Sequence, residues 1–276
     1  RRRTSFLQHL LEWLRGEPWV LAVWVDSRLT APGSGDVDEV ALHLAVEGPF
    51  AQAAGAWAAS LPDLAYTGPE PHGWTLITAD GVEWRLCLHG AGDDVGASHL
   101  QPVFDRRAPS PPAGPAAPER DRVSAPAQPD LAAMAGGFWR DLYRAGRAIR
   151  AERPLTAHHW LFACGGHLVD LYRAALAPDS GGRGWIGADE VPGLLRALEP
   201  VREALSAPVE CRAQRRAAHR LAETFEGLVL PLCRRVGAAY PMALRTLAFR
   251  SLEPPGQSAD ASGPGSGTGS GSGTKV

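Results

Sequence analysis

Lysine is nearly absent from this chain: Lys275 is the single lysine among 28 basic residues, and all the others are arginines. The basic residues face 30 acidic ones, which gives a formal net charge of -2 and a pI near 6.5. That balance gives no general reason to expect nucleic acid or an anionic membrane as a partner. No apolar run approaches the ~20 residues of a membrane-spanning helix. We therefore expect neither a nucleic-acid nor a membrane partner.

Cysteine is also scarce, and the four cysteines lie far apart in apolar surroundings, at Cys87, Cys164, Cys211 and Cys233. We interpret them as small reduced core residues and not as a disulfide framework. The basic start of the chain resembles the first part of a signal peptide. However, polar residues interrupt the apolar segment that would have to follow, at Gln8, His9, Glu12 and Arg15. We expect a cytoplasmic protein.

Apolar periodicity predicts a mixture of helices and strands up to residue 107. The first helix has one apolar face and ends at Gly16 and Pro18. "WVLAVWV" (19–25) is a continuous apolar run, which favours a fully buried strand, whereas "EVALHLAV" (39–46) alternates. Further elements are a short Ala-rich helix at 50–60 and a hairpin at 74–89, with Asp80-Gly81 as its two-residue turn.

The second half is predicted to be helical. Repeated prolines in 108–129 exclude a regular element, so this segment is a linker. Apolar residues at helical spacing then mark successive helices, of which the third includes Val191, Leu194, Leu198 and Leu205. The predicted fold class is α+β. It comprises an α/β domain with a small mixed sheet (1–107), the linker, a helical bundle (130–253) and a flexible Gly/Ser-rich tail (254–276).

Residues 5–107 resemble the aminoglycoside-type nucleotidyltransferases of the DNA polymerase β-like superfamily. The resemblance rests on a strand, a small-residue loop and an acidic strand start in "AVWVDSRLTAPGSGDVDEVALHLAV", on the hairpin "DGVEWRLCL", and on "PVFDRR". "FWRDLYRAGRAIRAE" (138–152) resembles the helical second domain more loosely. The resemblance implies that substrate binds between two domains, so we expect a cleft between the strand face of Glu39, Ala41 and His43 and the helices around 138–175.

Active members of this superfamily hold two Mg²⁺ ions with an Asp-x-Asp pair and a third Asp in the hairpin, because hard cations prefer carboxylate ligands. Alignment on the strand places the pair at Glu39 and Ala41. Alignment on the acids places it at Asp36 and Asp38, upstream of the strand. Arg85 stands where the third carboxylate belongs. The resemblance therefore implies a nucleotidyltransferase-like domain with a degenerate catalytic motif.

Each candidate site residue has a structural alternative. Ser27 and Arg28 either hold phosphate at a turn or end a strand. The acids Asp36, Asp38 and Glu39 are catalytic candidates, with Asp36 and Asp38 as metal ligands, or they form a solvated loop. Arg85 either binds an anionic ligand directly or pairs with Glu39 or Glu83 as a structural ion pair. His43 is a candidate ligand-binding residue or a histidine that the strand simply accommodates.

Two further segments invite functional interpretations. "HHWLFACGGH" (158–167) offers metal-ligand side chains, but the Trp, Leu and Phe between them favour a core helix. "CRAQRRAAHR" (211–220) is rich in arginine. On a helix flanked by glutamates, a solvated face is favoured over a nucleic-acid site.

Three functional hypotheses follow. The favoured one is a nucleotidyltransferase-like protein without two-metal catalysis, which needs no cofactor and binds a nucleotide or a small hydroxylated ligand. The alternative is an active Mg²⁺-dependent enzyme that transfers a nucleotide to a hydroxyl of a small molecule such as an aminoglycoside. The third is a purely structural partner in an assembly.

Overall fold

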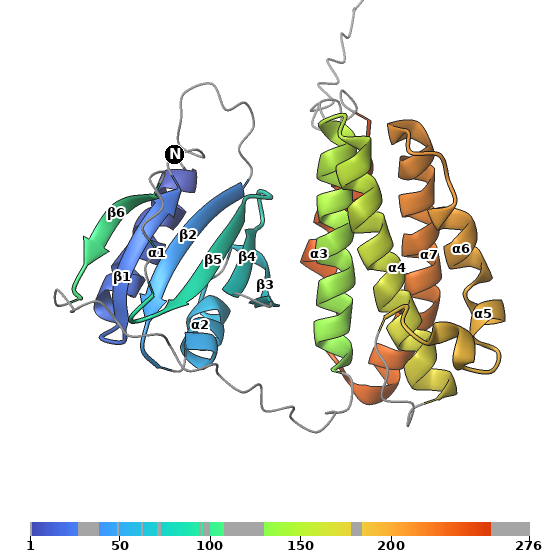
Figure 1. Ribbon diagram of the computed structural model, residues 1–276, viewed down its shortest axis with the longest axis horizontal. Helices are drawn as coiled ribbons and strands as arrows, with labels where there is room; N and C mark the ends of the chain where they lie inside the picture. The colour runs from blue at the N-terminus through green and yellow to red at the C-terminus, as the bar shows by residue number, and fades with distance from the viewer. Residues whose placement is uncertain are drawn as a thin grey trace, which may run out of the picture.

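The computed structural model describes residues 2–26, 39–48, 50–61, 63–70, 73–93, 95, 100–107, 130–177 and 184–254. Within these ranges the chain has a mixed α+β fold, in which a mixed sheet with its helices precedes a helical C-terminal part (Figure 1). The sequence predicts this order. The elements before residue 108 are α1 (Arg2–Gly16), β1 (Val20–Asp26), β2 (Glu39–Val46), α2 (Phe50–Ala59), β3 (Leu64–Glu70), β4 (Gly73–Thr78), β5 (Glu83–Gly90) and β6 (Leu100–Asp105).

The six strands of the described ranges form one sheet with the order β3-β4-β5-β2-β1-β6. β2 and β5 are parallel, and the other neighbouring pairs are antiparallel. Alternation along β2 points Leu42 and Leu44 to one face of the sheet, where both are fully buried. α1 and α2 contribute Leu10, Leu14 and Phe50 to the same core. The opposite face of β2 carries Glu39 and His43 as well as Ala45, which is buried in a small apolar cluster with Ala22 and Trp24.

The helical part consists of α3 (Leu131–Arg150), α4 (Pro154–Leu176), the 3₁₀ turn η2 (Ala188–Glu190), α5 (Leu194–Ala197), α6 (Glu199–Leu205), α7 (Cys211–Val236) and α8 (Met242–Leu252). Asp130 caps α3 by accepting hydrogen bonds from the N–H groups of Ala132 and Ala133. Phe138 of α3 and Phe225 of α7 stack with ring centroids 3.7 Å apart, at the centre of the helical core. Ile77 of β4 is buried in this core too, so the sheet packs against the helices.

Two expectations about local structure are wrong. The 74–89 hairpin is confirmed, but its loop has three residues, because the Thr78 N–H donates to the Val82 carbonyl (3.0 Å) and the Gly81 N–H to the Thr78 carbonyl (2.8 Å). A two-residue type I′ turn needs positive φ at both central residues, whereas here Gly81 (φ +91°) has it and Asp80 does not.

The prediction of one continuous third helix is also wrong. This segment is divided into η2, α5 and α6. Gly193 is left-handed (φ +78°) before α5, and Pro200 near the start of α6 cannot continue a preceding helix.

Among the described residues, none of the helices combines the length and the apolar character needed to cross a membrane.

Candidate functional site

The sheet face opposite α1 and α2 is polar on its two parallel strands. The register of β2 and β5 places Glu39 beside Glu83 and Ala41 beside Arg85. Because residues two apart on a strand share a face, these side chains all point away from the core around Leu42. This part of the sheet face therefore carries two glutamates, an alanine and an arginine.

Arg85 forms an ion pair with Glu39. Its Nη1 donates to Glu39 Oε1 at 2.9 Å, and both side chains are partly exposed. Burial alone would lower the pKa of Arg85, but the hydrogen bond and the charge of Glu39 raise it above its ordinary value. The predicted structural pairing of Arg85 with Glu39 is confirmed. Glu39 is therefore engaged by a guanidinium and is not a free carboxylate on this face.

His43 lies further along the same face and does not line the cavity described below. Its ring stacks on that of His89, with 3.0 Å between His43 Nδ1 and His89 Nε2. One of these nitrogens donates to the other, because two ring nitrogens this close cannot both be acceptors. This contact places the two histidines side by side on β2 and β5.

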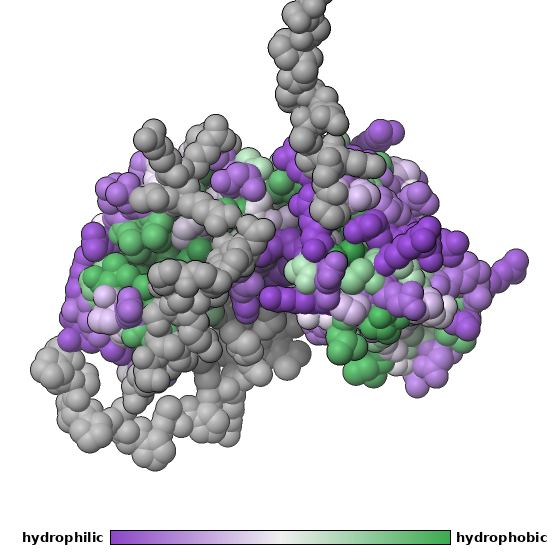
Figure 2. All heavy atoms as spheres, turned by 90° about the horizontal axis from the view of Figure 1, so that it is seen from above, coloured by the Kyte–Doolittle hydropathy of each residue, from purple (hydrophilic) through white to green (hydrophobic). Residues whose placement is uncertain are grey.

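A cavity of about 430 Å³ lies between this sheet face and the helices α3, α4 and α8. Figure 2 shows hydrophilic residues, in purple, between the two parts of the chain as well as on their outer surfaces. The charged side chains of the wall are Glu39, Glu70, Asp80, Glu83, Arg85, Arg144, Arg147, Arg150, Arg153 and Arg250. The cavity lies on the expected side of the sheet, but Glu39 reaches it whereas Ala41 and His43 do not.

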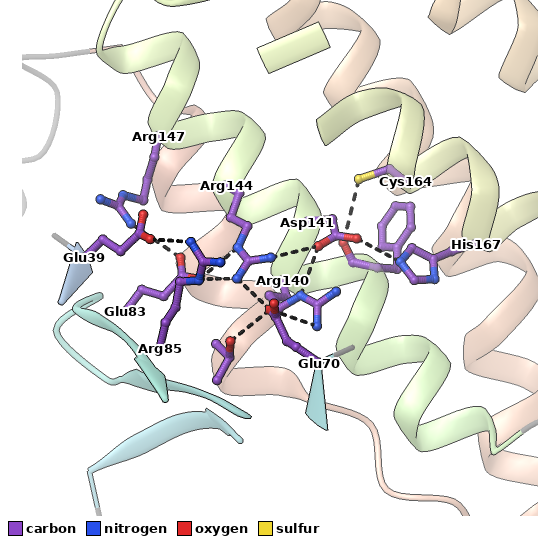
Figure 3. A network of polar contacts seen from close by, with 12 residues as sticks. Glu39, Glu70, Glu83, Arg85, Arg140, Asp141, Arg144, Arg147, Cys164 and His167 are labelled. Carbon is purple, nitrogen blue, oxygen red and sulfur yellow. Dashed lines mark hydrogen bonds and ion pairs between the residues drawn. The ribbon is translucent and has the colours of Figure 1, made fainter. Parts of the chain in front are cut away.

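Glu83 is the buried centre of the contact between the sheet and α3, and its side chain is only 1% exposed. Arg144 binds it through Nε at 2.8 Å and through Nη2, and Arg147 Nη1 approaches it at 3.5 Å (Figure 3). Arg144 Nη2 also donates to Glu70 at 2.7 Å. Burial alone would raise the pKa of Glu70, but the charges of Arg144 and Arg140 hold it below its ordinary value.

The network continues into the helical part through Asp141, which is nearly buried. Its carboxylate accepts from Arg140 Nε at 3.0 Å and lies 3.0 Å from His167 Nε2 (Figure 3). Burial alone would raise the pKa of Asp141, but the hydrogen bond with His167 and the charge of Arg140 lower it. Because Arg140 also approaches Glu70 and Arg144 approaches Asp141, a continuous series of polar contacts joins the sheet to α4.

A neutral contact supports the same interface. The Tyr143 hydroxyl donates to the Gly81 carbonyl in the hairpin loop, where both residues are buried. A side chain added at Gly81 would meet this hydroxyl at 2.8 Å, so the loop approaches α3 closely. The three-residue loop is thus held against the helix that supplies the arginines.

The 158–167 segment forms part of α4, as the core-helix interpretation predicts. Cys164 is fully buried, its Sγ lies 3.8 Å from the Phe138 carbonyl, and burial raises the pKa of its thiol. His167 contacts Asp141. In the ranges that the structure describes, no group of three or more His, Cys, Asp or Glu side chains is arranged to hold a metal ion.

Sequence reasoning missed most of this network. A signal exists: Arg140, Arg144 and Arg147 are spaced by four and three residues, which places them on one side of a helix that is rich in apolar residues. Burying a charged side chain costs free energy unless it is paired, so a row of arginines on one side of a helix indicates acidic partners on the element that packs against that side. The partners themselves, Glu70 and Glu83, lie more than 60 residues away.

The remaining sequence candidates lie outside the described residues. These are Ser27, Arg28, Asp36 and Asp38, together with the 108–129 segment and the tail from residue 255. Their roles stay predictions.

Comparison with known proteins does not identify a family for this chain. No protein-family model matches the chain, and no curated protein matches it. Among solved structures, the chain is similar to an aminoglycoside 6-adenyltransferase from Bacillus subtilis, with a TM-score of 0.39 and 10% sequence identity over 88% of this chain and 94% of that chain. A likeness at this level supports no argument about activity, so the functional case rests on the residues above.

Proposed function

We propose that this chain is a nucleotidyltransferase-like protein that lacks two-metal catalysis and binds a nucleotide or another small ligand between its sheet and its helices. The observation that carries the proposal is the ion pair of Arg85 with Glu39 on the strand face where metal ligands would be needed. The order of strands and helices, read from the sequence, supports the nucleotidyltransferase-like part.

Electrostatics support the absence of a metal. Two unit charges ~4 Å apart interact by about 4 kcal/mol at an effective dielectric near 20, so a guanidinium would repel Mg²⁺ by about 8 kcal/mol. Arg85 cannot relieve this by losing its proton. Glu39 offsets one positive charge at most, and Ala41 offers no ligand.

The cavity supports a binding role. Its volume of about 430 Å³ falls within the ~300–1,000 Å³ typical of small-molecule sites, and charged groups from the sheet, from α3 and α8 and from the residue before α4 converge on it. The buried pair of Arg144 with Glu83 and its partly buried pair with Glu70 hold the two walls together. A ligand in this position would contact both parts of the chain.

A transfer assay tests the proposal. With labelled ATP, millimolar Mg²⁺ and a panel of aminoglycosides, we expect no nucleotidyl transfer by the full chain. Transfer that is abolished by Asp36→Asn or Asp38→Asn would establish the enzyme instead. Glu203→Gln, which changes an exposed acid on α6, is the matched control and should not affect any transfer.

A further inference from the structure

Three arginines of the cavity wall form no ion pair with a described residue: Arg150, Arg153 and Arg250. They come from three places, the last turn of α3, the residue before α4 and the last turn of α8. All three are exposed. The other wall arginines have glutamate partners, which include Glu39 and Glu83.

The acids of the wall are already engaged. Glu39 binds Arg85, and Glu70 and Glu83 bind Arg144. Asp80 accepts a hydrogen bond from a neighbouring threonine hydroxyl in the hairpin loop. With six arginines and four acids in the wall, the unmatched charge is positive, and it lies on the helical side of the cavity.

Helix electrostatics explain only part of this cluster. The C-terminal end of a helix carries partial negative charge, which favours Arg150 on α3 and Arg250 on α8. Arg153 stands at the N-cap of α4, where the partial charge is positive, and its side chain makes no capping hydrogen bond. A cation there is unfavourable unless an anion is near.

The turn between α3 and α4 fixes the position of Arg150 and Arg153. Glu152 within it is left-handed (φ +54°), a conformation that non-glycine residues seldom adopt. The Arg153 N–H donates to the Ala148 carbonyl at 2.9 Å, which closes the turn. The two arginines are therefore held on either side of a defined backbone conformation beside the cavity.

We propose that Arg150, Arg153 and Arg250 bind a chain of phosphates without a metal ion. Guanidinium groups suit this ligand, because their planar donors match phosphate oxygens and remain charged. The inference rests on the proposed ligand-binding role and specifies its ligand as a nucleoside triphosphate or an inorganic oligophosphate. The same charge repels a polycation, so aminoglycosides do not enter this side of the cavity.

Calorimetric titration of the full chain in EDTA tests this site, with inorganic tripolyphosphate, ATP and adenosine as probes. We expect tripolyphosphate to bind, with an affinity that falls as salt is added. Arg150→Gln, Arg153→Gln and Arg250→Gln should each weaken binding about tenfold, which corresponds to 1.4 kcal/mol. Arg216→Gln is the matched control, because Arg216 is exposed on α7 and outside the wall. Tighter binding of ATP than of tripolyphosphate would identify the nucleotide as the ligand, and equal binding the phosphate chain alone.

Two results would overturn the phosphate site. One is the absence of tripolyphosphate binding, and the other is wild-type affinity in all three wall variants. If adenosine binds and tripolyphosphate does not, the phosphate site is wrong while the proposed ligand-binding role stands. If none of the probes binds, both are wrong. Thermal melting of each variant shows that it is folded, which we expect because all three side chains are exposed.

Discussion

Glu83→Gln tests the contact between the sheet and α3 most severely. Glu83 is 1% exposed and accepts from Arg144, itself 9% exposed, so substitution removes the main countercharge of a buried guanidinium. Removing one partner of a buried ion pair costs ~3–5 kcal/mol. Arg144 keeps its bond to Glu70, so we expect the lower end, about 3 kcal/mol of unfolding free energy.

Glu39→Gln is the matched control. Glu39 is beside Glu83 in the parallel register and also binds an arginine, but its pair is 39% and 46% exposed. Exposed ion pairs contribute ~0–1 kcal/mol, so we expect a loss below about 1 kcal/mol. The contrast isolates the effect of burial from that of charge.

Urea unfolding followed by circular dichroism measures both variants. We expect the midpoint of Glu83→Gln to fall well below that of Glu39→Gln. The reasoning would be refuted if the two substitutions cost the same, since burial of the Glu83 carboxylate would then contribute nothing to stability.

Three further predictions concern metal affinity, a buried hydrogen bond and acid stability. Ala41→Asp combined with Arg85→Asp should raise Mg²⁺ affinity, whether or not turnover appears, and calorimetric Mg²⁺ titration that finds no gain would contradict it. Tyr143→Phe leaves a buried carbonyl unpaired and should cost ~1–3 kcal/mol in the same urea assay, where an unchanged midpoint would count against the contact. Burial would raise the pKa of Asp141, but its hydrogen bond with His167 lowers it, so this carboxylate stabilises the fold above about pH 4, and that contribution is lost as pH falls further. Asp141→Asn should flatten the dependence of stability on pH in that acidic range, and an unchanged slope in acid titrations would exclude the assignment.

Local patterns were sufficient for most elements of the fold. Strands β1 and β2 and helices α2 and α7 follow from apolar runs, alternation and helical spacing. β3 was missed, because "LAYTGPE" combines Gly68 and Pro69 and shows no alternation. As the edge strand of the sheet, β3 tolerates a proline that a central strand would exclude. The helical spacing of apolar residues over 191–205 likewise predicted one helix, although Gly193 and Pro200 divide this segment into shorter ones.

The candidate site was predictable only in part. Sequence reasoning named Glu39 and Glu83 as alternative partners of Arg85, and the structure pairs Arg85 with Glu39 across the parallel strands β2 and β5. The pair of Arg144 and Glu83 could not be predicted, since residues 61 apart meet through tertiary packing that no local period encodes. The same holds for Arg250, which the fold brings to the wall that contains Arg150.

ATP titration with and without Mg²⁺ tests the central claim, metal-independent ligand binding, most directly. Two calorimetric series on the full chain, one in EDTA and one in millimolar Mg²⁺, give a Kd for each condition. We expect binding in EDTA and a Kd in Mg²⁺ that is no lower, because Mg²⁺ bound to ATP neutralises phosphate charge that the wall arginines would otherwise contact. A tenfold lower Kd in Mg²⁺ would mean 1.4 kcal/mol of favourable coupling between metal and nucleotide. Binding that appears only with Mg²⁺, or no binding in either series, would contradict the claim.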